Sequence, residues 1–155
     1  MLTIIIAVLA FGFDQLTKFL AVKLLKGNQA FVIIDNFLSF AYVENRGAAF
    51  GILQNKKILF VVVTLVVLII VVSFLHKNYN TVGKWLKVSL GLLVGGTLGN
   101  FLDRIRLDYV VDFISVRLFN KFDFAVFNVA DICIVIGTIM LMIYIILSES
   151  KEINE

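Results

Sequence analysis

Two aspartates in this chain stand among apolar residues, where a carboxylate needs an explanation. Asp112 lies in YVVDFISV (109–116), and Asp131 lies in FNVADICIVIG (127–137). A buried, unpaired carboxylate is costly, so such groups are usually neutralised, paired or used in chemistry. Two aspartates that lie close together share one proton, which makes one an acid and the other a base. Such a pair can activate water for attack on a peptide carbonyl and protonate the leaving nitrogen, without a metal ion or a nucleophilic serine.

A structural role is the alternative for each aspartate. A single aspartate near the start of a helix is more often a cap or a paired residue than a catalyst. For Asp112 alone the structural interpretation is preferred, whereas for the pair, with apolar flanks on both, function is favoured. Asn128 precedes Asp131 by three residues and lies on the same helical face, so it either bonds to the pair or caps the helix.

Further polar residues cluster at the ends of apolar stretches. Asp14 and Lys18 are spaced i,i+4 and can pair, either as charge compensation or to bind a substrate or head group. The residues alone favour the structural role. Asn100, Asp103 and Arg104 end the third apolar stretch. We expect Arg104 to neutralise Asp103, which would leave Asp112 free for another task.

Two glycine-containing motifs complete the set. In ENRGAAFG (44–51), Asn45 and Gly47 predict either a simple β-turn or a backbone clamp for an extended substrate. The third apolar stretch carries a doubled GxxxG pattern, which lets another helix approach closely. We expect this pattern to serve packing within the monomer; its glycines are Gly91, Gly95 and Gly99, with Gly96 beside them.

The composition predicts an integral membrane protein. Of 155 residues, 61% are hydrophobic and none is proline, and the mean hydropathy is +1.01. A soluble domain of this size needs more polar surface.

The net charge of the chain is +3, and the charged residues are scattered along it, which argues against a nucleic-acid partner. One cysteine, Cys133, excludes an internal disulfide, and the absence of a Cys/His cluster argues against a metal site. The single histidine, His76, is interpreted as a solvated loop residue without a role.

Four apolar stretches are long enough to cross a bilayer as helices, which takes about 18–20 residues. The first lacks a basic leader and carries charges inside it, so we expect a retained helix and not a cleaved signal peptide. The whole chain, 1–155, is predicted to be one membrane-embedded domain. The predicted helices cover about 2–22, 58–75, 85–102 and 126–147.

The connections between these helices are unequal. Residues 76–84 form a short loop, whereas 23–57 and 103–125 are longer and lie on the opposite face. The first long segment has β-rich runs broken at DN and NRG, which predicts a small sheet on the membrane surface. YVVDFISVRLF (109–119) is either extended or a short helix. The predicted fold class is therefore an all-α polytopic membrane protein, with four transmembrane helices and a small β-rich cradle.

The distribution of basic residues along the chain predicts an orientation in the membrane. The long-loop side carries nine lysines and arginines, which are Lys23, Lys26, Arg46, Lys56, Lys57, Arg104, Arg106, Arg117 and Lys121. The other side carries four, which are Lys77, Lys84, Lys87 and Lys151. The positive-inside rule, taken alone, would place the long loops in the cytoplasm.

Taken together, the motifs closely resemble the lipoprotein signal peptidases, also called signal peptidase II. The resemblance spans nearly the whole chain, and five blocks in one order make it specific. The blocks are DQLTK (14–18), NRGAAFG (45–51), GGTLGNFLDR (95–104), VVDF (110–113) and FNVAD (127–131).

The resemblance implies a membrane-embedded aspartic endopeptidase. Such an enzyme removes the signal peptide from diacylglyceryl-modified bacterial prolipoproteins, cutting just before the lipidated cysteine. By matching motifs, Asp112 and Asp131 are the catalytic pair. The residues that line the substrate site are then Asn45, Gly47, Asn100, Arg104 and Asn128. Asp14, Lys18 and Asp103 support the site. The family is inhibited by the cyclic peptide globomycin. We expect no cofactor, membrane lipids as surroundings, and a monomer.

The resemblance also implies a location and an orientation. It places the protein in the bacterial cell membrane, with both termini cytoplasmic and the active site at the extracytoplasmic face. This orientation conflicts with the lysine and arginine count, and we give the resemblance more weight. A proton-coupled transporter fits less well, because the charges gather at one face. A structural scaffold would leave the two aspartates unexplained.

Overall fold

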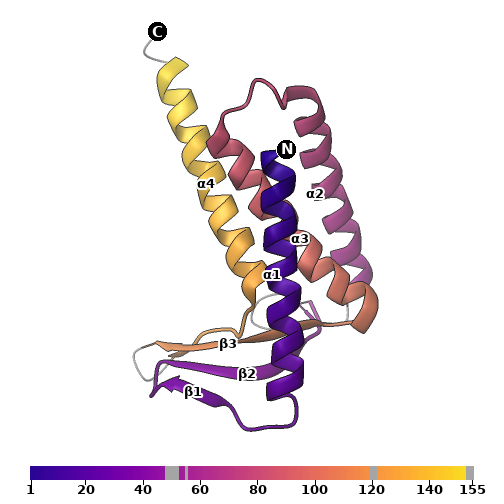
Figure 1. Ribbon diagram of the computed structural model, residues 1–155, viewed down its shortest axis with the longest axis vertical. Helices are drawn as coiled ribbons and strands as arrows, with labels where there is room; N and C mark the ends of the chain where they lie inside the picture. Colours follow the sequence, from indigo (N-terminus) through magenta and orange to yellow (C-terminus); the bar gives the residue numbers. More distant parts are fainter. Residues whose placement is uncertain (48–52, 55, 119–121, 153–155) are drawn as a thin grey trace.

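A computed structural model describes residues 1–47, 53–54, 56–118 and 122–152 (Figure 1). The sheet lies at one end of the helix bundle, and the N-terminus of α1 lies toward the other (Figure 1). The helices are α1 (Leu2–Leu25), α2 (Lys57–Asn78), α3 (Lys84–Leu107) and α4 (Val129–Glu152). The strands are β1 (Phe31–Ile34), β2 (Leu38–Asn45), β3 (Val110–Leu118) and β4 (Phe122–Asp123), which form one antiparallel sheet in the order β1-β2-β3-β4.

The four helices match the four predicted spans, and each is long and apolar enough to cross a membrane. At 1.5 Å per residue, a helix of 22 to 24 residues is roughly 33–36 Å long, against a hydrocarbon core of about 30 Å. The helices continue through polar turns beyond the apolar runs. α3 keeps Arg104 and Arg106 in its last turn and ends before Asp108, which is left-handed at φ 67°. The prediction of His76 as a loop residue is wrong, because it lies in the last turn of α2.

α3 is the central helix of the bundle. Both α1 and α4 pack closely on it, and glycines make the approach possible. A Cβ atom on Gly95 would lie 2.6 Å from the carbonyl oxygen of Ala7 in α1, and one on Gly96 would lie 2.5 Å from that of Ala130 in α4. The predicted role of the glycine pattern in packing within the monomer is therefore confirmed. α2 contributes no buried residue, and many of its apolar side chains are exposed.

The sheet fixes the place of Asp112. β3 pairs with β2 so that Asp112 lies opposite Val43, and the question of strand or short helix is settled as strand. Val111 and Phe113, on the other face of β3, form a small core with Ala21 of α1. Phe127, just before α4, pairs with Ile114 of β3. The start of α4 is thereby held beside the strand that carries Asp112.

Candidate active site

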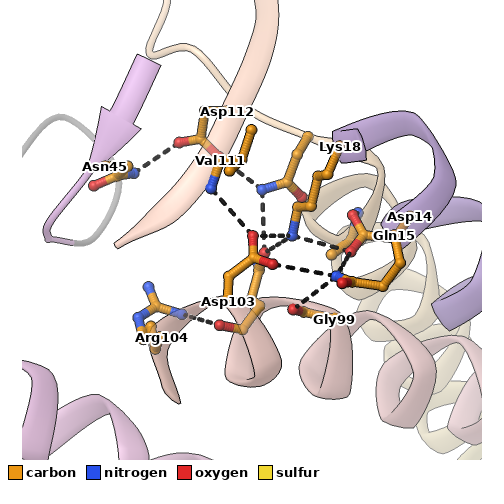
Figure 2. Close-up of polar contacts among 12 residues, drawn as sticks. Asp14, Gln15, Lys18, Asn45, Gly99, Asp103, Arg104, Val111 and Asp112 are labelled. Atoms are coloured by element: carbon orange, nitrogen blue, oxygen red, sulfur yellow. Dashed lines mark hydrogen bonds and ion pairs between the residues drawn. The ribbon is translucent and has the colours of Figure 1, made fainter. Parts of the chain in front are cut away.

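Asp112 is almost completely buried, with 1% of its surface exposed, and two asparagines hold its carboxylate. Asn45 of β2 donates from Nδ2 to one oxygen at 2.8 Å, and Asn128 donates from Nδ2 to the other at 2.6 Å. Figure 2 shows Asn45 reaching Asp112 from the neighbouring strand. Asn45 lies opposite Val110, so it is the diagonal neighbour of Asp112 on the same face of the sheet.

Asp131 lies in the first turn of α4, in a reciprocal cap with Asn128. The Asp131 N–H donates to Oδ1 of Asn128 at 3.0 Å, and the Asn128 N–H donates to Oδ2 of Asp131 at 3.1 Å. This is the arrangement of a capping box, which satisfies two helix-end donors at once. Because Asn128 also donates to Asp112, both of its predicted alternatives hold: it caps the helix and bonds to the pair.

Two asparagine side chains connect the aspartates. Asn100 of α3 donates from Nδ2 to Asp131 at 2.8 Å, and its Oδ1 accepts from Asn128 at 3.1 Å. The chain of contacts therefore runs from Asp112 through Asn128 and Asn100 to Asp131. In the described part of the chain no hydrogen bond joins the two carboxyl groups directly. Both carboxylates instead accept hydrogen bonds from a common amide frame, which fixes their relative position.

A buried lysine supports this frame from behind. The Nζ of Lys18 donates to Oδ1 of Asn100 at 2.8 Å and forms ion pairs of 3.0 Å with Asp14 and with Asp103. The predicted i,i+4 pair of Asp14 and Lys18 is thus confirmed. Asp14 also accepts a hydrogen bond from the N–H of Ala130 at 2.9 Å, so α1 holds the first turn of α4. Lys18 fixes the acceptor side of the Asn100 amide, which turns its donor side toward Asp131.

The predicted pairing of Asp103 with Arg104 is wrong. Adjacent residues on a helix point about 100° apart and do not face each other. Asp103 faces α1 and pairs with Lys18, and its Oδ2 also accepts from the N–H of Val111 at 3.1 Å. Arg104 lies apart from Lys18 at the end of α3 (Figure 2). It donates to the carbonyl of Gly47 at 3.2 Å, and its Cζ atom lies 4.6 Å from the ring centre of Phe60.

The turn at the end of β2 orients Asn45. The N–H of Gly47 donates to Oδ1 of Asn45 at 2.9 Å, so the amide nitrogen of Asn45 is directed to Asp112. The carbonyl of Gly47 accepts from Arg104. The remainder of the predicted clamp motif, residues 48–51, lies outside the described residues. Asn45, Gly47 and Arg104 therefore form one wall that links β2 to α3.

Burial changes the acidity of Asp112. Loss of hydration raises the pKa of its carboxyl group from 3.8 to about 6, and the negative charge of Asp131 adds to the rise. Hydrogen bonds from Asn45 and Asn128 hold the pKa below the value that burial alone would give. A carboxyl group with this pKa can hold a proton under mildly acidic to neutral conditions and release it during a reaction.

All ten residues predicted for the site belong to one network of hydrogen bonds and ion pairs among the described residues, and the prediction missed one further side chain of this network. Gln15 donates to Asp14 at 3.1 Å, to Asp103 at 3.3 Å and to the carbonyl of Gly99 at 3.3 Å. Its only sequence signal is its place within DQLTK. Among the described residues, no group of three or more His, Cys, Asp or Glu side chains is arranged to hold a metal ion. Chemically, the site offers two carboxyl groups held by amides at the junction of sheet and helices.

Comparisons with known proteins show which proteins this chain resembles. A family model described as signal peptidase (SPase) II matches residues 6–147. A lipoprotein signal peptidase of Clostridium tetani is 43% identical over 149 residues, covering 96% of this chain and 95% of the relative. A lipoprotein signal peptidase of Streptococcus agalactiae is 44% identical over 147 residues, covering 95% and 93%.

Two solved structures share the fold. Both are described as bacterial membrane enzymes. One aligns with a TM-score of 0.83 at 37% identity, covering 96% of this chain and 90% of its own. The other has a TM-score of 0.79 at 39% identity, covering 92% and 91%. The similarity therefore extends over the helices and the sheet together.

Proposed function

This chain belongs to the signal peptidase II family, and from that premise we propose that it is an aspartic endopeptidase of prolipoproteins. It removes the signal peptide from bacterial prolipoproteins whose cysteine carries a diacylglyceryl group, and it cuts just before that cysteine. The substrate class follows from the name shared by the relatives. The observation that supports the aspartic mechanism is the pair of carboxylates bridged by Asn100 and Asn128.

In the proposed reaction the two aspartates have different tasks. Asp131 lies in the first turn of α4, and it takes a proton from the attacking water. The water oxygen bonds to the scissile carbonyl carbon. Asp112, whose raised pKa favours the protonated form, gives its proton to the nitrogen as the C–N bond breaks.

The other residues position these two groups. Asn100, Asn128 and Asn45 fix the carboxylates, and Lys18 fixes Asn100. Arg104 is close enough to interact electrostatically with Asp131 and Asp112. Its positive charge therefore stabilises the negative charge that develops on the carbonyl oxygen. Asp14 and Asp103 balance the charge of Lys18.

The expected surroundings of the reaction are a bilayer surface. The four spans and the family indicate a multi-pass membrane protein. We propose that the sheet end faces the extracytoplasmic side and that both termini are cytoplasmic. The substrate's lipid anchor and signal segment then reach the aspartates from the membrane, and water reaches them from outside. A cyclic peptide inhibitor such as globomycin would compete for the same place.

Cleavage of a synthetic prolipoprotein peptide tests the proposal. The protein is purified in detergent and given the peptide with or without the diacylglyceryl group, and mass spectrometry locates the cut. We expect cleavage before the lipidated cysteine, and a fall of roughly 10³-fold or more in kcat for Asp112→Asn and for Asp131→Asn.

A third aspartate provides the matched control. Asp108 has an exposed side chain, lies outside the network and pairs with Lys57, so Asp108→Asn should cleave like the wild type. Substantial turnover by Asp112→Asn or Asp131→Asn would reject the proposed pair.

A further inference from the structure

A cavity lies between α1, α2 and α3, and neither Asp112 nor Asp131 lines it. It has a volume of about 680 Å³ and a predominantly apolar lining. The lining comes from the N-terminal half of α1, the C-terminal end of α2 and the middle of α3, and it includes Ala7, Phe11, Val72, Leu75, Val94 and Leu98. None of these residues takes part in the aspartate network. The reaction proposed above leaves this cavity without a task.

The cavity opens beside the polar end of α2, where the nearby charges are basic. His76 and Tyr79 belong to its lining. The Nζ of Lys87 lies 4.5 Å from the ring centre of Tyr79, and Lys77 follows His76 in the last turn of α2. No lining residue carries a carboxylate. This rim therefore favours an anionic group beside an apolar interior.

Thr3 is the lining residue with an unsatisfied polar group. Only 4% of its surface is exposed. Its hydroxyl is the single buried side-chain polar atom in the described residues for which the structure provides no hydrogen-bond partner. Buried hydroxyls are normally satisfied, so this one keeps the capacity for a further polar partner.

We propose that the cavity binds an anionic phospholipid from the leaflet at the α1 N-terminal end of the molecule. An acyl chain occupies the apolar interior, and the phosphate lies at the rim near Lys87 and His76. Basic pockets between membrane helices are suited to anionic head groups. The cavity volume is within the range of about 300–1,000 Å³ typical of small-molecule sites.

The membrane segment of a substrate is the competing occupant, and the charge of the rim disfavours it. The start of a signal peptide is basic, and the basic rim would repel it.

Retention of lipid by the purified protein tests this inference. Phosphatidylglycerol or phosphatidylcholine is added in detergent, and native mass spectrometry counts the lipid that stays bound. The test variant is Val72→Trp, which fills the cavity. The matched control is Ile70→Trp on the same helix, outside the lining and similarly exposed, at 61% against 56%. Because α2 has no buried residues, both variants should fold.

We expect wild type and Ile70→Trp to retain one phosphatidylglycerol, and Val72→Trp to retain at least tenfold less. The double variant His76→Gln/Lys87→Gln should lose the preference for phosphatidylglycerol over phosphatidylcholine, whereas Lys84→Gln should keep it. Equal retention by the two tryptophan variants, or no preference in the wild type, would overturn the inference. So would a Val72→Trp protein with a raised KM for prolipoprotein and unchanged lipid retention, because that result assigns the cavity to the substrate.

Discussion

At the scale of single residues, Asn128 combines two tasks in one side chain. Its carbonyl oxygen caps α4, and its nitrogen donates to Asp112 and to Asn100. The residue is completely buried, so water cannot replace any of these hydrogen-bond partners. The geometry of the proposed catalytic pair and the start of α4 therefore depend on the same residue.

Two substitutions separate these tasks. Asn128→Ser keeps a capping oxygen and loses the amide donor, whereas Asn128→Ala loses both. We expect both variants to lose at least tenfold in kcat, and the alanine variant to be less stable than the serine variant by about 1 kcal/mol. Cleavage kinetics and thermal unfolding in detergent measure the two effects. Wild-type kcat in Asn128→Ser would show that the bridge to Asp112 is dispensable.

The raised pKa of Asp112 predicts the pH dependence of cleavage. Asp112 is protonated below about pH 6 and ionised above it. If it is the proton donor, kcat/KM should fall as the pH rises above about 6, approaching tenfold per pH unit. A pH profile of kcat/KM on a single peptide measures this. A profile that instead rises through pH 6 and stays high would assign the basic role to Asp112.

The raised pKa of Asp112 also predicts how the free energy of unfolding changes with pH. A carboxyl group whose pKa is higher in the folded state stabilises the fold fully below its unfolded pKa of 3.8, and this contribution is lost as the pH rises through about 6. A difference of about 2 pKa units corresponds to roughly 3 kcal/mol. Thermal unfolding between pH 4 and 7 should show this loss in the wild type, and Asp112→Asn should lack it.

Residue types and motifs predicted the members of the polar network but not all of their contacts. The apolar flanks of Asp112 and Asp131 were enough to single them out, and the family motifs supplied the asparagines. The partner of Asp103 was missed, because Arg104 is its neighbour in sequence and Lys18 is its neighbour in space. That contact depends on how α1 packs on α3, which the pattern of side chains along one helix does not contain.

At the scale of elements, the helices were easier to predict than the strands. Long apolar runs predicted all four helices, and the errors lie at the ends, where polar turns such as that of Arg104 and Arg106 remain helical. β3 stayed undecided between strand and helix, because its conformation depends on pairing with β2, some 70 residues earlier. Local sequence carries little of that information.

Close approach of α1 and α3 is the element-scale feature most open to test. Gly95→Ala places a methyl group against the backbone of Ala7, so the helices must separate. We expect a loss of about 1–3 kcal/mol in stability and reduced cleavage, because Asp14 and Lys18 move with α1.

A glycine on α1 offers the control for this prediction. A methyl group added at Gly12 would meet no other atom within 4 Å, so Gly12→Ala should be neutral or stabilising by up to about 1 kcal/mol. Thermal unfolding and cleavage of both variants decide the matter. Equal stability of Gly95→Ala and Gly12→Ala would show that the close contact between α1 and α3 at Gly95 does not determine stability.

At the scale of the whole molecule, the basic residues of the sheet end need not signal the cytoplasm. Several of them are engaged within the protein. Lys26 and Arg46 each pair with Glu44 at 3.3 Å, and Lys57 pairs with Asp108. Arg104 donates to the carbonyl of Gly47 within the candidate site. A count of lysines and arginines includes residues that the fold itself uses, and this limits what it says about orientation.

Labelling of single cysteines measures the orientation. With Cys133 replaced by alanine, Gln29→Cys reports the sheet end and Asn80→Cys the short loop after α2; both positions are exposed. We expect an impermeant maleimide to label Gln29→Cys in intact spheroplasts and Asn80→Cys only after the membrane is opened. The reverse pattern would support the charge count and place the proposed active site in the cytoplasm.

The hydrogen bond from Ala130 to Asp14 joins the first helix of the chain to the last. The ribosome completes α1 long before α4, so a nascent chain with three inserted helices has one half of this contact and lacks Asp131. Under the proposed mechanism, such a chain is anchored in the bilayer and is still catalytically silent. Activity would then begin only when α4 enters the membrane.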